Sequence, residues 1–129
     1  MLNYIIYRIG QAIALFVPLK IGYKISQLVV DLQYLFAASD RKAVKKNLKV
    51  IFPQKSNHQI RKIRRQMYRN FAKYLVDFFR FSKLDKEYLK KNIKIENIQY
   101  FDQALKDNKG VIVLTAHLGN WELGGTVIA

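Results

Sequence analysis

The residue types best suited to chemistry lie near the end of the chain, at His117 and Glu122. An unprotonated imidazole accepts a proton from an alcohol, and a nearby carboxylate fixes its tautomer and stabilises the imidazolium that forms. With two histidines and nine acids in 129 residues, an acid five positions after a histidine arises by chance about one time in seven. The spacing therefore needs support from its context.

That context is a strand-like run followed by a turn. Residues 111–115 are a continuous apolar run, which is typical of a strand covered on both faces, and side chains just beyond such a strand face the ligand crevice of an α/β sheet. Gly119 lets the backbone turn, and Asn120 can cap a helix whose first N–H groups could hold an oxyanion. We therefore expect Gly119, Asn120 and Trp121 to bind substrate beside the catalytic His117.

The same segment limits the reaction mechanism. It holds no side-chain nucleophile except Thr115, and the chain has no cysteine, which favours direct attack by a substrate hydroxyl over a covalent enzyme intermediate. His117 and Glu122 could supply two metal ligands, but zinc helix motifs place histidines four apart and nothing nearby completes a set. No metal is therefore predicted. The competing interpretation is a histidine that only packs or caps at a strand end.

Charge is the second strong signal. The chain has 23 Lys and Arg against nine Asp and Glu, a net charge of +14. From Arg41 to Lys73 there are twelve basic residues and no acid. Such a field attracts phosphates of nucleic acid or anionic lipid, or an acidic protein, although a solvated helix face is the simpler alternative. Aromatic residues lie on the apolar stripe and not beside these charges, so we expect no nucleic-acid partner.

The N-terminus suggests contact with a membrane. Residues 2–17 are mostly apolar and precede Pro18, but they are short for a bilayer span of about 20 residues, and a signal peptide fits poorly. In residues 19–35 a polar stripe at helical spacing lies opposite apolar residues, which predicts an amphipathic helix; the stripe consists of Lys20, Lys24, Gln27 and Asp31. We predict that residues 1–38 are membrane-anchoring helices, either a marginal span or two helices in the interface. A buried hairpin in a soluble domain has the same period and stays open.

Residues 39–129 are predicted to be the N-terminal part of a truncated α/β domain. A basic helix over residues 41–52 should precede a long helix opened by a capping box at Ser56 and Gln59. The apolar and aromatic stripe of that helix, from Ile60 to Phe81, is most simply core packing.

Two shorter helices should follow, capped by Asp85 and Asn97, with a strand at residues 93–95 between them. This alternation of predicted helices and strands indicates the α/β class. The small apolar residues 124–129 carry no stop signal, so we expect an incomplete domain that is inactive alone because its sheet lacks later strands.

The segment VIVLTAHLGNWELGG resembles the signature block of the bacterial lipid A biosynthesis acyltransferases, enzymes with a glycerolipid-acyltransferase-like domain. The resemblance extends over nearly the whole chain. It implies that His117 activates the acceptor hydroxyl and that Glu122 supports it. Asn97 stands where a glycine is frequent in relatives, which puts a local turn in doubt. The upstream similarity includes Asn47, Leu48, Phe52, Pro53, Tyr68, Arg69 and Asn70.

The resemblance also implies partners and location. The donor would be an acyl thioester of acyl carrier protein or coenzyme A, with no other cofactor, and the acceptor a membrane glycolipid at the cytoplasmic face of the bacterial inner membrane. A lipid A precursor is the expected acceptor, and another glycolipid such as a phosphatidylinositol mannoside is the alternative. The basic cluster would draw the protein to anionic membrane. A noncatalytic membrane-surface or nucleic-acid binding module, with a purely structural HLGNWE segment, is the remaining alternative.

Overall fold

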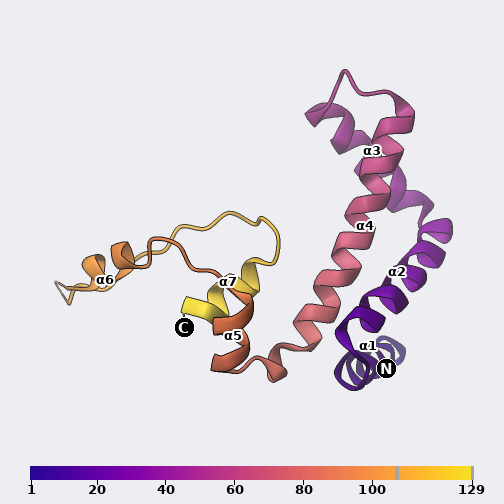
Figure 1. The fold of residues 1–129 in the computed structure, drawn as a ribbon. Helices are drawn as coiled ribbons and strands as arrows, with labels where there is room; N and C mark the ends of the chain where they lie inside the picture. The colour runs from indigo at the N-terminus through magenta and orange to yellow at the C-terminus, as the bar shows by residue number, and fades with distance from the viewer. Residues whose placement is uncertain (107, 129) are drawn as a thin grey trace. The chain divides into compact units, whose positions relative to one another are not determined.

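The computed structural model describes residues 1–106 and 108–128, and their regular secondary structure is helical (Figure 1). The chain divides into two compact units, Met1–Arg80 and Phe81–Ala129. The predicted anchoring segment, residues 1–38, lies within the first unit.

Four helices make up the first unit. They are α1 (Leu2–Phe16), α2 (Leu19–Phe36), α3 (Ala38–Ile51) and α4 (Asn57–Phe79). Pro18 separates the first two because proline lacks the N–H that would continue α1 and is well tolerated at the start of α2. The predicted capping box opens α4: Ser56 Oγ accepts a hydrogen bond from the Gln59 N–H at 3.2 Å, and Gln59 Oε1 accepts one from the Ser56 N–H at 2.9 Å.

Helix α4 is the element against which the others pack. It contacts α2 along much of its length and also contacts α1 and α3 (Figure 1). Gly22 of α2 is buried, and a Cβ there would lie 3.3 Å from Val76 Cγ1 of α4. The two helices approach closely because Gly22 has no side chain. The buried apolar residues are Ala14, Val30, Leu48, Ile60, Ala72 and Val76.

Polar contacts fix the helix ends and the helix pairs. Arg80, just after α4, donates hydrogen bonds to the carbonyls of Ala14 and Val17, the latter at 3.0 Å. These bonds satisfy carbonyls that the end of α1 leaves without partners. Tyr23 Oη of α2 donates to Asp77 Oδ1 of α4 at 2.5 Å.

The prediction that the apolar and aromatic stripe of α4 is core is wrong for Met67, Phe71 and Phe78, which are all exposed. Phe71 and Phe78 are 58% and 44% exposed, whereas Ala72 and Val76 on the neighbouring helix face are buried. Close packing against α2 requires small side chains at the contact. The large rings of Phe71, Tyr74 and Phe78 lie beside that contact, where successive pairs have centroids 5.6 and 6.3 Å apart.

The first two helices have exposed apolar faces. Leu28 and Phe36 of α2 are 67% and 85% exposed, and Phe16 of α1 is also exposed. Within the described residues, no helix combines the length and the apolar character that crossing a bilayer requires. Membrane anchoring by residues 1–38 stays a prediction.

The second unit contains short helices joined by irregular backbone. They are the 3-10 helix η1 (Phe81–Lys83), α5 (Lys86–Asn92), α6 (Gln99–Leu105) and α7 (Trp121–Ile128). The predicted cap at Asp85 is confirmed, since its carboxylate accepts the Tyr88 N–H at 2.6 Å.

The predicted cap at Asn97 is wrong. Ile98 holds the N-cap position of α6 without a side-chain hydrogen bond. Asn97 instead has a φ of 60°, in the left-handed region that glycine favours. Asparagine tolerates this conformation better than most residues do, so the backbone forms the left-handed turn without a glycine.

The predicted α/β class is wrong. Residues 93–95 and 111–115 were expected to be strands, yet the structure forms no strand among the residues it describes. Ile112 and Leu114, expected to be covered on both faces, are 93% and 94% exposed. An apolar run becomes a strand only when a neighbouring strand takes up its backbone hydrogen bonds. This backbone finds no such partner in residues 1–106 and 108–128.

Candidate functional site

The HLGNWE segment is a sharp turn followed by a helix. His117 lies at a bend after residues 111–116, which have no regular secondary structure. The N–H of Leu118 donates to the carbonyl of Ala116 at 2.7 Å, and Gly119 has a φ of +63°. Side chains other than glycine are strained in that conformation. The predicted role of Gly119 in the turn is confirmed, although the residues before the turn are not a strand.

Asn120 begins the helix that follows. Its Oδ1 accepts the backbone N–H of Leu123 at 3.1 Å, and its carbonyl accepts the N–H of Gly124 at 3.3 Å. This is the predicted N-cap. Because Asn120 is also the first residue after the glycine turn, one side chain couples the turn to α7.

The predicted catalytic base contacts the helix through a ring pair. The imidazole of His117 and the indole of Trp121 have centroids 4.2 Å apart and planes inclined by 36°. Aromatic rings at such separations attract each other by about 0.5–1.5 kcal/mol beyond burial. His117 remains exposed. The contact restricts the imidazole on one side and leaves it open to a ligand.

Asn120 also presents an unused donor. Its Nδ2 is buried and has no hydrogen-bond partner among the described residues. A buried donor without a partner costs about 1–3 kcal/mol. Glu122 lies in the first turn of α7, where a carboxylate interacts favourably with the positive end of the helix dipole. Its carbonyl accepts the Thr126 hydroxyl at 3.0 Å.

These residues form one local constellation. His117, Gly119, Asn120, Trp121 and Glu122 all belong to the turn and to the first turn of α7. The turn presents an exposed imidazole and a buried amide donor, the types of group that proton transfer and carbonyl binding use. No group of three or more His, Cys, Asp or Glu side chains in the described parts of the chain could hold a metal ion.

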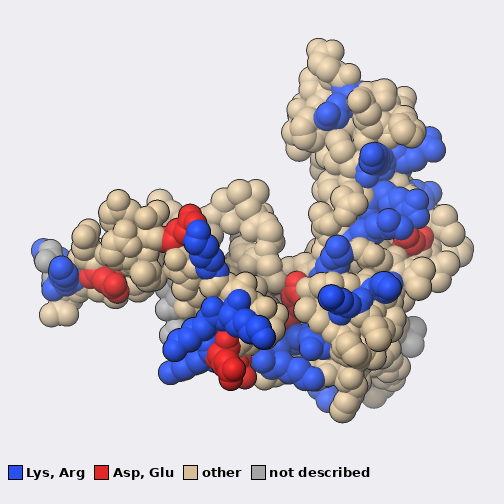
Figure 2. All heavy atoms as spheres, viewed as in Figure 1, with Lys and Arg blue, Asp and Glu red and all other residues tan. Residues whose placement is uncertain are grey.

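The predicted basic cluster forms a surface of the first unit. Figure 2 shows Lys and Arg atoms gathered over helices α3 and α4, with few acidic atoms among them. One acid organises part of it: Asp31 of α2 accepts hydrogen bonds from Arg65 at 3.0 and 3.1 Å and from Arg69 at 3.1 Å. Hydrogen bonds from Arg69 and Arg65 hold the pKa of the Asp31 carboxyl well below its ordinary value. The hydrogen bonds to Asp31 in turn raise the pKa of the Arg69 guanidinium.

A second group of the basic surface surrounds Tyr34. The guanidinium groups of Arg41 and Arg64 lie over its ring, 5.2 and 5.4 Å from the centroid. Arg64 Nε donates to Tyr34 Oη at 2.8 Å, and Arg64 Nη1 donates to the carbonyl of Arg41 at 2.7 Å. Tyr68 packs edge-on against Tyr34, and burial raises the pKa of Tyr68.

Sequence reasoning missed the roles of Asp31 and Tyr34. It counted Asp31 only as part of the polar stripe of an amphipathic helix. Both residues meet arginines that are 30 to 38 positions away in the sequence. The sequence nevertheless contains a signal for the ion pairs of Asp31. Residues 1–80 have only three acids, one of which is Asp31, against sixteen Lys and Arg. An isolated acid among so many cations attracts the nearest of them.

Comparison with known proteins identifies a family. A family model described as bacterial lipid A biosynthesis acyltransferase matches residues 1–129. No curated protein and no solved structure matches the chain.

Proposed function

We propose that this chain, which belongs to the bacterial lipid A biosynthesis acyltransferase family, acts within the full-length protein to transfer a fatty acyl group to a hydroxyl of a membrane glycolipid, with His117 as general base. Family membership supports acyl transfer to a lipid A-like acceptor. The single observation that carries the assignment of the base is that His117 remains exposed while Trp121 holds one side of its ring.

In the proposed mechanism, the acceptor hydroxyl gives its proton to His117 and attacks the thioester carbonyl of the donor. The tetrahedral intermediate expels the thiolate of the donor, which takes up the proton that His117 holds and leaves as the thiol. Glu122 stabilises the imidazolium while the proton resides there. The donor is an acyl thioester of acyl carrier protein or coenzyme A, and no other cofactor takes part.

We assign substrate contacts to Gly119, Asn120 and Trp121. The positive φ of Gly119 turns the backbone without a side chain in the way. The buried Nδ2 of Asn120 is a donor that a carbonyl or anionic oxygen of the substrate would satisfy. Trp121 covers one side of the base and contributes an apolar surface beside it.

The two histidines of the chain allow a matched test. In the full-length protein, His117→Ala should lower acyl transfer about 10²–10⁴-fold, because general-base catalysis contributes about that much. His58→Ala, at the exposed start of α4, should leave transfer unchanged. Near-normal transfer by His117→Ala, with the helical content of the wild type, would eliminate His117 as the base.

The same assay distinguishes the acceptor and the donor. A lipid A precursor and a phosphatidylinositol mannoside should each be offered with acyl carrier protein and coenzyme A thioesters. We expect the lipid A precursor to be acylated. Transfer only to the mannoside would keep the base and replace the acceptor, and no transfer to any hydroxyl would contradict the enzyme assignment.

We further propose that the basic surface attracts the protein to the anionic cytoplasmic face of the inner membrane, where the exposed apolar faces of α1 and α2 enter the interface. The exposed apolar residues and the excess of basic residues in residues 1–80 support this. Binding should favour anionic over neutral vesicles and weaken as salt rises.

The same surface is poorly suited to nucleic acid. Two arginines already lie over the ring of Tyr34, so that ring is not open to base stacking, which single-stranded binders use. Salt-sensitive binding to DNA without affinity for anionic vesicles would overturn the membrane proposal.

A further inference from the structure

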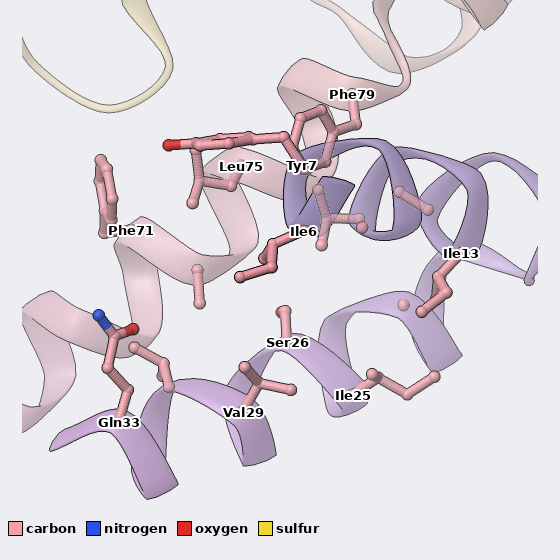
Figure 3. Close-up of a pocket in the computed structure, with 16 residues that line it drawn as sticks. Ile6, Tyr7, Ile13, Ile25, Ser26, Val29, Gln33, Phe71, Leu75 and Phe79 are labelled. Atoms are coloured by element: carbon pink, nitrogen blue, oxygen red, sulfur yellow. The ribbon is translucent and has the colours of Figure 1, made fainter. Parts of the chain in front are cut away.

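A groove of about 430 Å³ lies between α1, α2 and α4 in the first unit. Figure 3 shows Ile6 of α1 and Ser26 of α2 pointing into the same gap, with Leu75 of α4 on the opposite wall from Val29. Most of the lining atoms are carbon, from side chains that include Ile6, Ile13, Ile25, Val29, Phe71 and Leu75.

Helices α1 and α2, which line the groove, also have apolar side chains that are exposed to solvent. Leu28 and Leu32 lie on the outer face of α2, beside the wall that Val29 supplies, and both are more than half exposed. Ile5 and Ile9 are similarly exposed on α1. Exposed apolar side chains on both helices are compatible with a protein or membrane contact.

The two ends of the groove differ in polarity. In Figure 3 the amide of Gln33 and the ring of Phe71 lie at one end, and Ile13 and Ile25 lie at the other. Helix α4 continues from Phe71 toward its N-terminus through Tyr68 and Arg64, which lie on the same side of the helix because they are three or four residues apart. The Gln33 end therefore leads toward the arginine group around Tyr34.

This arginine group has positive charge available for an anion. Arg64 and Arg41 use donors on the Tyr34 hydroxyl and on backbone carbonyls. In the part of the chain that the structure describes, neither arginine forms a salt bridge with an acid. An anion beside them would therefore meet two cations that form no salt bridge with a carboxylate.

The size of the groove indicates what could fill it. A helix with side chains is about 10–12 Å wide, so a volume of 430 Å³ would hold only about one turn of it. A narrow flexible chain without backbone polar groups suits the apolar walls better, since buried N–H and C=O groups would find few partners there. Together with cations beyond one end, the groove fits an anionic amphiphile.

We propose that the first unit binds an anionic membrane lipid, with one alkyl chain in the α1–α2–α4 groove and the phosphate headgroup beside Arg41 and Arg64. The proposal rests on the membrane docking proposed above and not on acyl transfer. It uses neither His117 nor α7.

Photo-crosslinking tests where the lipid chain lies. The protein is bound to vesicles that contain phosphatidylglycerol with a diazirine in the acyl chain, irradiated, and mapped by mass spectrometry. We expect adducts on groove residues such as Ile6, Ile13 and Leu75. Replacing the labelled lipid by phosphatidylcholine of the same chain should lower these adducts several-fold, because its headgroup has no net charge.

A matched pair of variants separates the groove from general membrane contact. Ser26→Phe fills the groove, and the lost Ser26 bond runs only to the Tyr23 carbonyl of the same helix. Leu28→Phe adds a ring on the exposed face. The first variant should lose the groove adducts and the second should keep them, while both sediment with vesicles.

Other results would distinguish the groove proposal from the membrane-docking proposal. Sedimentation with adducts only on exposed residues such as Leu28 and Phe36 would overturn the groove proposal and keep membrane docking. Absence of both sedimentation and adducts would overturn both proposals, whereas acyl transfer would be tested separately. Equal groove adducts in the two variants would also contradict the groove, provided that circular dichroism shows both variants to be as helical as the wild type.

Discussion

The imidazole of His117 lies 4.2 Å, centroid to centroid, from the indole of Trp121. The two residues are four apart, with a glycine turn and a helix start between them. The turn therefore holds the proposed base against the helix that follows it, and each residue between them contributes to that geometry.

Replacing Trp121 tests whether this ring contact positions the base. Trp121→Leu should lower kcat/KM about 2- to 10-fold, since an aromatic pair contributes about 0.5–1.5 kcal/mol and 1.4 kcal/mol is a factor of ten. Trp121→Phe keeps a ring and should recover most of the loss. Steady-state acyl transfer measures both variants. Equal activity of the leucine and phenylalanine variants would show that the ring has no positioning role.

Asn120 has two functions that substitution can separate. Asn120→Ala removes the cap and should lower the free energy of unfolding of α7 by about 1 kcal/mol. Asn120→Asp keeps a capping oxygen, which the helix dipole favours, but loses the Nδ2 donor. It should fold normally and lower kcat/KM about 2- to 10-fold, the value of one hydrogen bond. Wild-type kinetics for Asn120→Asp would remove Nδ2 from the substrate contacts.

Asp31 should make the stability of the first unit depend on pH. Its pKa is lowered in the folded state by Arg69 and Arg65, so its contribution is present above the unfolded value of about 3.9 and disappears as pH falls through the lower folded value. Asp31→Asn should cost about 1 kcal/mol at pH 7. Urea unfolding from pH 7 to pH 2 should show the wild type and variant converging at low pH.

A control for Asp31 is available at Glu96. Glu96 pairs with Lys94 at 2.6 Å, but both side chains are largely exposed, so Glu96→Gln should change stability little at any pH. A constant difference between wild type and Asp31→Asn down to pH 2 would contradict the linkage to the Asp31 carboxylate.

The packing of α2 on α4 should be sensitive to Gly22. A Cβ at Gly22 would lie 3.3 Å from Val76 Cγ1, whereas a Cβ at Gly10 would meet Phe79 at an ordinary 3.5 Å. Gly22→Leu should therefore cost about 1–3 kcal/mol from overpacking. Gly10→Leu places its side chain toward the open groove and should be better tolerated. Thermal unfolding of the two variants compares them, and equal loss of stability would show that the close approach at Gly22 is unimportant.

The sequence determined the features whose contacts join residues only a few positions apart. The capping box at Ser56, the cap at Asp85 and the turn from Gly119 to Asn120 were all predicted, because each joins a side chain to a backbone only a few residues away. The helices of the first unit were also predicted, since one apolar face at helical spacing is visible in sequence order.

Tertiary structure decided what depends on distant partners. Asp31 meets Arg69 38 positions later, and Gly22 meets Val76, contacts that no local pattern contains. The predicted strand at residues 111–115 required hydrogen bonds to a neighbouring strand, and no strand forms among the residues that the structure describes. Both the apolar run and the helix caps are visible in the sequence. A helix cap needs hydrogen bonds only to residues within one turn, whereas a strand forms only when a neighbouring strand takes up its backbone hydrogen bonds.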